Sequence, residues 1–184
     1  QKKLGLEIKQ SNLCSEIILP TNEERTAVCC LSSVNLEYFD EWSTVDEFIP
    51  DLITMLDNVL EHFIDSVKDT GGYSKAAYSA MRERSVGLGA MGFHSYLQKN
   101  SIPFESMYAS SFNHKAFTLI KDRALTATRK LGEERGEAPD MKGSGKRNAH
   151  LLAIAPNASS SIICGGTSPS VEPFRANVYT HKTL

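Results

Sequence analysis

Residues 150–166, HLLAIAPNASSSIICGG, place a short apolar run between a polar loop and a serine-rich turn. The run Leu151–Ala155 has the length and composition of a buried strand, and Pro156 ends it. The preceding residues, 136–148 (GEAPDMKGSGKRN), are polar and rich in glycine, which predicts a loop. This part of the chain therefore predicts a strand that leads into a turn with free amides and hydroxyls.

Two long helices are predicted before this strand. Apolar residues recur at helical spacing from Thr44 to Phe63, and again from about Glu105 to Arg135. Thr44 and Glu47 have the spacing of a capping box at the start of the first helix. Pro50 falls within that pattern, so the helix either starts near Pro50 or bends there.

Three further segments complete the pattern. LCSEIILP (13–20) and TAVCCLSSVNL (26–36) predict neighbouring extended elements joined by a turn, and SVGLGAMGFHSYLQK (85–99) predicts a short buried element followed by a helix. Strands that alternate with long helices predict an α/β fold rather than an all-α fold. A length of 184 residues with 41% hydrophobic content favours a single domain.

The composition also limits the classes of partner. A net charge of -2 gives no broad basic field, so neither nucleic acid nor an anionic membrane is an expected partner. No apolar run approaches the roughly 18 residues that cross a bilayer, and the N-terminus lacks the apolar segment of a signal peptide. Four cysteines are too few for a disulfide scaffold. We therefore expect a cytoplasmic protein with reduced thiols.

The segment SNLCSE (11–16) carries an amide, a thiol and a carboxylate at alternate positions. If it is extended, Asn12, Cys14 and Glu16 share one face, while Cys29 and Cys30 of the next segment point to opposite faces. Thiols, a carboxylate and an anion-binding turn suit redox chemistry on a phosphorylated small molecule. The alternatives are a buried thiol with solvated neighbours and, for the serine turn, an ordinary helix cap.

The run GLGAMG (87–92) matches the glycine pattern of dinucleotide-binding proteins. A nicotinamide-dependent oxidoreductase is therefore an alternative function. The pattern lacks a well-formed strand before it and an acidic residue at the end of a second strand. We therefore favour the explanation that these glycines allow close packing of a helix on a strand.

Four segments, in this order, resemble the catalytic large subunit of class I ribonucleotide reductase. They are SNLCSEI (11–17), AVCCLSSVNL (27–36), RSVGLGAMGF (84–93) and LLAIAPNASSSIICGGTSPSVEPFRANVYTHKTL (151–184). The resemblance covers essentially the whole chain. It implies that residues 1–184 are a fragment of a ten-stranded α/β barrel with a central finger loop. It also implies that the fragment reduces ribonucleotides, with diphosphates as the expected substrates, as part of a larger or complemented subunit.

The resemblance also implies roles for residues of the first segment. Cys14 would be the transient thiyl radical that removes the 3′ hydrogen of a ribonucleotide. Glu16 would be the general base toward the 3′ hydroxyl, and Asn12 would hydrogen-bond the substrate. Leu13 and Ser15 are included among the expected substrate-binding residues.

Further residues follow from the same resemblance. Cys29 would be one member of the reducing thiol pair, and Cys30 would serve packing. The turn that receives the diphosphate would be formed by Asn157, Ala158, Ser159 and Ser160, mainly through backbone amides. No metal or cofactor is expected on this chain.

The expected partners are a small metal-containing subunit that generates the radical, a second large subunit, an external dithiol of the thioredoxin or glutaredoxin type, and complementary fragments of the same subunit. The resemblance implies that the second reducing cysteine, the radical-relay tyrosines and the C-terminal cysteine pair lie outside the chain. The cobalamin-dependent class of reductase uses the same combination of cysteine, asparagine and glutamate side chains, so it is an alternative. A non-enzymatic assembly module is another.

Overall fold

The computed structural model describes residues 5–180. Its sheet consists of two parallel strands, β1 (Cys30–Asn35) and β2 (Val86–Met91), whose register pairs Cys30 with Val86 and Asn35 with Met91. On the other edge of β2, Leu152 forms an isolated parallel bridge with Leu88. Three extended segments therefore lie side by side, with β2 in the middle.

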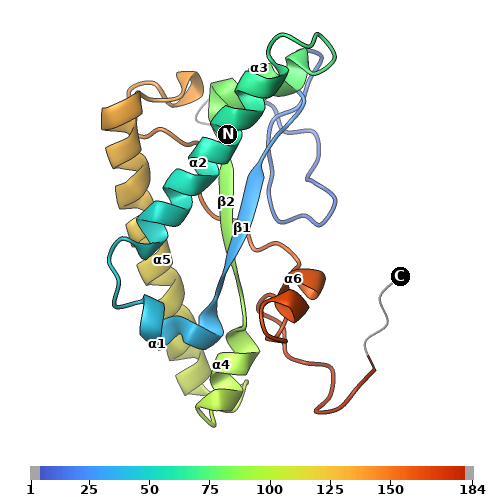
Figure 1. The fold of residues 1–184 in the computed structure, drawn as a ribbon, viewed down its shortest axis with the longest axis vertical. Coiled ribbons are helices and arrows are strands. Elements are labelled where there is room, and N and C mark those ends of the chain that lie inside the picture. Colours follow the sequence, from blue (N-terminus) through green and yellow to red (C-terminus); the bar gives the residue numbers. More distant parts are fainter. Residues whose placement is uncertain (1–4, 181–184) are drawn as a thin grey trace.

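Helices connect and cover these strands (Figure 1). They are α1 (Phe39–Trp42), α2 (Phe48–Val67), α3 (Ser74–Glu83), α4 (Phe93–Lys99), α5 (Met107–Arg135) and α6 (Ala158–Ile163), with 3-10 turns at Leu36–Tyr38 and Pro139–Met141. Figure 1 shows α2 and α5 on one side of the strands and α6 on the other. Within residues 5–180, every helix is too short or too polar to span a lipid bilayer.

The two faces of the sheet are packed differently because side chains alternate along a strand. On one face, Val34, Val86 and Leu88 join the main core beneath α2 and α5. On the opposite face, Ala153 and Cys29 contact a small apolar cluster that includes Ile17 and Leu19. The large core thus lies under α2 and α5, and the N-terminal segment packs on the other face.

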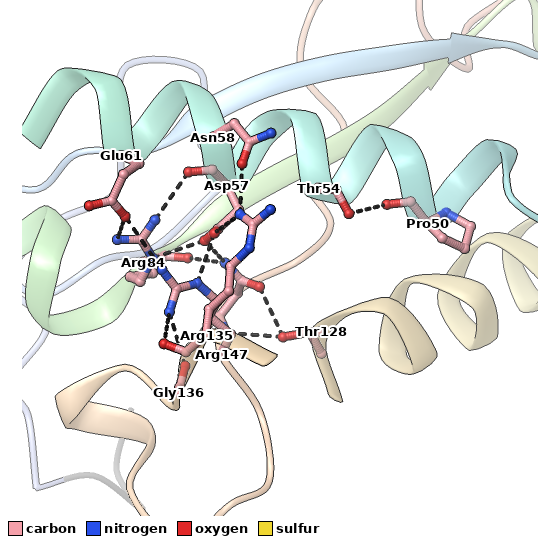
Figure 2. Close-up of polar contacts among 11 residues, drawn as sticks. Pro50, Thr54, Asp57, Asn58, Glu61, Arg84, Thr128, Arg135, Gly136 and Arg147 are labelled. Carbon is pink, nitrogen blue, oxygen red and sulfur yellow. Dashed lines mark hydrogen bonds and ion pairs between the residues drawn. The ribbon is translucent and has the colours of Figure 1, made fainter. Parts of the chain in front are cut away.

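A buried carboxylate joins the helices to the loop that precedes the third extended segment. Asp57 of α2 is fully buried, and its Oδ1 accepts hydrogen bonds from Arg84 Nε at 2.9 Å and Asn148 Nδ2 at 3.0 Å. Its Oδ2 accepts from Arg147 Nε at 2.8 Å and from Arg135 at 3.1 Å. Figure 2 shows the three arginines converging on Asp57. Hydrogen bonds from Arg147 and Asn148 to Asp57 therefore hold this loop against α2, although the sequence of the loop is polar.

The helix predictions were mostly confirmed. The helix predicted from about Glu105 begins at Met107, where the Ser106 hydroxyl accepts a hydrogen bond from the Ala109 N–H at 3.1 Å. The first long helix starts at Phe48, so Pro50 lies in its first turn, where no backbone N–H is needed. The predicted capping box was wrong because the Thr44 hydroxyl donates to the Glu41 carbonyl instead. The helix α3 was not predicted.

The strand predictions were confirmed in part. β1 and β2 lie within the predicted segments, and Leu151–Ala155 contributes one bridge rather than a full strand. Residues 13–20 form no strand, so that predicted extended element was wrong, although the two segments are neighbours because Ile17 and Leu19 pack against Ala27 and Cys29. β1 pairs instead with β2, through a parallel connection that needs the intervening helices. Together these elements form an α/β arrangement of parallel extended segments with helices on both sides.

Candidate active site

Residues 12–17 form a tight loop rather than an extended segment. The backbone N–H of Asn12 donates to the Ile17 carbonyl at 3.3 Å, and the Ile17 N–H donates to Asn12 Oδ1, also at 3.3 Å. Ser15 has a φ of 60°, in the left-handed region, and its N–H donates to the Asn12 carbonyl. The predicted alternation of faces was therefore wrong here. The physical reason is that the Asn12 side chain offers the backbone a local hydrogen bond that favours a turn.

The loop exposes some of its side chains and buries others. Leu13 is 99% exposed, and Asn12, Cys14 and Ser15 are also exposed. Glu16 is half-buried, and its Oε2 atom is buried without a hydrogen-bond partner. A buried carboxylate oxygen without a donor is unfavourable, so this atom is suited to accept a hydrogen bond from a ligand.

Cys29 lies on the face of the sheet opposite the main core. Its side chain packs against the cluster of Ile17, Leu19 and Ala153, whereas Cys30 packs toward α2 and the main core. The opposite orientation of the two neighbouring thiols was thus predicted correctly. Burial, with smaller contributions from the negative charges of Cys30, Glu16 and Glu83, raises the pKa of the Cys29 thiol to about 12. Cys29 is therefore a protonated thiol at neutral pH.

A cavity of about 330 Å³ lies between the N-terminal segment and the sheet. Its lining includes Asn12, Ile17, Leu19, Ala27, Cys29 and Leu31. Two of the predicted site residues, Asn12 and Cys29, thus face one cavity. Cys14 is not in its lining.

Glycines make this face of the sheet flat. A Cβ atom on Gly89 would overlap the carbonyl oxygen of Ala153, and one on Gly87 would lie 2.8 Å from the Ala153 Cβ. Both glycines lie within β2, whereas the dinucleotide fingerprint requires them at a turn between a strand and a helix. Their close neighbours belong to adjacent extended segments and not to a helix. The arrangement therefore does not favour the nicotinamide alternative.

The predicted diphosphate turn forms the start of α6. Asn157 is buried at its N-terminus, while Ala158, Ser159 and Ser160 are exposed. A second cavity, of about 630 Å³, is lined in part by Ala158, Ser161 and Thr167. It shares no lining residue with the cavity at Cys29. The predicted site residues therefore do not surround one cavity. Asn12 and Cys29 line the first cavity, and Ala158 lines the second.

Ser33 is a site residue that the sequence analysis missed. Its hydroxyl accepts a hydrogen bond from Asn157 Nδ2 at 3.0 Å, which links β1 to the start of α6. The sequence did contain a sign of this position: Ser33 comes four residues after Cys29, so both side chains lie on the same face of an extended segment. What the sequence could not show was that residue 157 lies beside it.

The comparisons with known proteins agree with this architecture. A family model described as "Ribonucleotide reductase, barrel domain" matches residues 1–146 and 138–184. The large subunit of ribonucleoside-diphosphate reductase from Invertebrate iridescent virus 3 is 55% identical over the whole chain, and a putative large subunit from Frog virus 3 is 55% identical over 99% of it. The alpha subunit of a class Id ribonucleotide reductase from Actinobacillus ureae superposes with a TM-score of 0.92 at 44% identity, over 96% of the chain. The chain spans 29%, 32% and 34% of these three proteins, respectively.

Proposed function

We propose, because this chain belongs to the ribonucleotide reductase family through its barrel domain, that it reduces ribonucleotides to deoxyribonucleotides as part of a larger catalytic subunit. The substrates we propose are ribonucleoside diphosphates, the class named in the viral relatives. Residues 1–184 would supply one section of the barrel together with the loop that carries the reactive cysteine.

The proposed reaction begins at Cys14. A carbon-bound hydrogen on a sugar is too inert for removal by a base, whereas a thiyl radical on Cys14 can take it from C3′ and become a thiol. Glu16 accepts the proton of the 3′ hydroxyl, which promotes loss of the 2′ hydroxyl as water. Asn12 holds the sugar by hydrogen bonding, and Leu13 and Ser15 contact the substrate.

Cys29 is proposed as one of two thiols that supply the reducing electrons. The pair gives two electrons and becomes a disulfide, and Cys14 then returns its hydrogen to C3′ and is again a thiyl radical. The high pKa of Cys29 suits this role because the thiol keeps its proton until the leaving water needs it. The second thiol of the pair lies, in this proposal, outside residues 1–184, and an external dithiol reduces the disulfide after each turnover.

The diphosphate is proposed to bind at Asn157, Ala158, Ser159 and Ser160. Exposure of the last three residues supports this assignment, because their hydroxyls and backbone amides are open to a ligand. Ala158 has no polar side chain, so it would act through its N–H alone. Ala158, Ser159 and Ser160 belong to α6, which Figure 1 shows on the opposite side of the strands from α2 and α5.

The observation that carries the proposal is the state of Glu16 and Cys29. Glu16 Oε2 is a buried carboxylate oxygen without a hydrogen-bond donor, and Cys29 is a half-buried thiol whose pKa is raised by burial first and, to a smaller extent, by the charges of Cys30 and Glu16. An acid that lacks a donor and a protonated thiol are the two groups that removal of the 2′ hydroxyl requires. A purely structural module gains nothing from leaving such an oxygen unpaired.

The partners we propose are a small metal-containing subunit that supplies the radical, a second large subunit, and the remaining sections of the barrel. One edge of β1 supports the last, because within residues 5–180 no strand pairs with it, and an unpaired strand edge is a site for strand pairing. Nucleic acid and membranes are not proposed as partners, and a cytoplasmic location is proposed. A cobalamin-dependent reductase remains the alternative within the family.

The test is deoxyribonucleotide formation by the full-length subunit with its radical-generating partner and a dithiol. Cys14→Ser, Glu16→Gln and Cys29→Ser should each reduce product to background. Cys30→Ser is the matched control for Cys29→Ser, since Cys30 faces the opposite side of β1, and it should retain activity. Normal turnover by Cys29→Ser would contradict the proposal. We also expect residues 1–184 alone to form no product.

A further inference from the structure

The side chain of Asn157 points into the fold rather than toward a ligand. Its Nδ2 donates to Ser33 Oγ at 3.0 Å, to the Ala155 carbonyl at 2.8 Å and, more weakly, to the Ala90 carbonyl at 3.5 Å. These acceptors belong to β1, to the third extended segment and to β2, respectively. A single amide therefore binds all three extended segments to the residue that begins α6.

The backbone of Asn157 continues this connection into the helix. Its carbonyl accepts the Ser161 N–H at 2.8 Å, which is the first hydrogen bond of α6. Ser161 is buried, whereas Ala158, Ser159 and Ser160 are exposed between these two residues. The exposed part of the turn is thus held from both sides by buried residues.

The segment that follows α6 is fixed to the ends of β1 and β2. The Thr167 hydroxyl donates to Asn35 Oδ1 at 3.3 Å, and the Gly92 N–H donates to the Ser168 carbonyl at 2.7 Å. Ser95 and Ser168 exchange hydrogen bonds of 3.0 and 2.8 Å between hydroxyl and backbone N–H. These hydrogen bonds fix the segment after the C-terminal end of α6. The orientation of α6 therefore depends on the contacts at its N-terminal end, which Asn157 makes.

We propose that Ser33 and Asn157 form a clamp that positions the turn 158–160 for the diphosphate of the substrate. Ser33 and the Asn157 side chain are positioning residues and do not touch the substrate. This inference rests on the proposed function, and it revises the expected part of Asn157 in binding, leaving only its backbone to face the ligand. The diphosphate is remote from the reacting C2′ and C3′ atoms, so we expect its contacts to be the same in the ground state and the transition state. The clamp should therefore affect KM rather than kcat.

Ser33→Ala removes one acceptor of the clamp with little change in volume. In the full-length subunit with its partner, we expect KM for a ribonucleoside diphosphate to rise about 3- to 10-fold, since one buried hydrogen bond is lost, while kcat changes less than about twofold. Ser33→Thr keeps the hydroxyl and should restore the wild-type KM. Ser32→Ala is the matched control, because Ser32 lies on the other face of β1 and takes no part in the clamp.

Asn157→Asp is the stronger variant, because a carboxylate cannot donate to the Ala155 and Ala90 carbonyls. Hydrogen–deuterium exchange of peptides covering 154–166 should be faster in Asn157→Asp and Ser33→Ala than in the wild type and Ser32→Ala. If the wild type turns over nucleotides but Ser33→Ala leaves KM within twofold, or leaves exchange unchanged, the clamp is overturned. If the wild type forms no deoxyribonucleotide, the proposed function is overturned, and this role of the clamp with it.

Discussion

Asp57 and Arg147 are 90 positions apart in the chain, yet Arg147 Nε donates a hydrogen bond of 2.8 Å to Asp57 Oδ2. The carboxylate is fully buried, and Arg84 binds its other oxygen. Burial acts to raise the pKa of Asp57, but the hydrogen bonds and charges of Arg84 and Arg147 outweigh it, so the pKa lies below its usual value. The Asp57 carboxylate is therefore stable as a buried anion because Arg84 and Arg147 bind it.

Replacing Asp57 should destabilise the fold strongly. Asp57→Asn leaves Arg84 and Arg147 without a buried counter-charge, and breaking such a network typically costs about 3–5 kcal/mol. Hydrogen–deuterium exchange of α2 and α5 peptides in the full-length protein measures the change in the free energy of local unfolding. Asp65→Asn is the control, since Asp65 pairs with Lys68 at the surface, where an ion pair contributes less than about 1 kcal/mol. Equal effects of the two substitutions would contradict the prediction.

Glu83 should make the fold less stable as pH rises. Its carboxylate is buried, and burial raises its pKa from 4.5 to about 7, against the opposing effects of Ser85 and Arg25. Between these two values the unfolded chain has lost the proton while the folded chain still holds it, so the free energy of unfolding falls as pH rises from 4.5 to about 7.

Glu83→Gln tests this dependence because glutamine resembles the protonated acid and does not titrate. We expect the contribution of this residue to the pH dependence to disappear in the variant, which exchange measurements at pH 5 and at about pH 7 should reveal once corrected for intrinsic exchange rates. The same slope in both proteins would show that another group causes it. Asp57 acts in the opposite sense, and its contribution is lost only below its ordinary value of 3.8.

The Cys29 thiol should react slowly with alkylating reagents. With a pKa of about 12, compared with an ordinary 9.0, its thiolate fraction at pH 8 is roughly a thousandfold smaller than in the unfolded chain. Pulsed labelling with iodoacetamide, followed by mass spectrometry, should therefore modify Cys29 about 10³-fold more slowly in the native protein than in urea. Similar rates in both states would contradict the burial and the raised pKa.

Gly89 should tolerate alanine poorly. The added Cβ would overlap the Ala153 carbonyl oxygen, which belongs to the backbone and cannot rotate away. We expect Gly89→Ala to destabilise the fold by about 1–3 kcal/mol, as in other overpacked sites. Gly72→Ala is the control, because its nearest neighbour would be the Thr70 carbonyl at 4.0 Å. Exchange of β2 peptides measures both.

The amino-acid sequence by itself determined the α/β class, the positions of α2 and α5, and the opposite orientation of Cys29 and Cys30. These features follow from local periodicity, since the spacing of apolar residues fixes which side of a helix or strand is buried. The resemblance to the reductase family rested on short motifs that are also local in the chain.

The tertiary structure alone decided how distant residues meet. Asn157 turns inward to Ser33, and Asp57 binds three arginines from separate segments. Each depends on hydrogen bonds that become favourable only when burial excludes water, and burial is set by segments far apart in the sequence. The sequence pattern of one segment does not identify the distant residue that it will contact, so only the folded structure determines which residues meet.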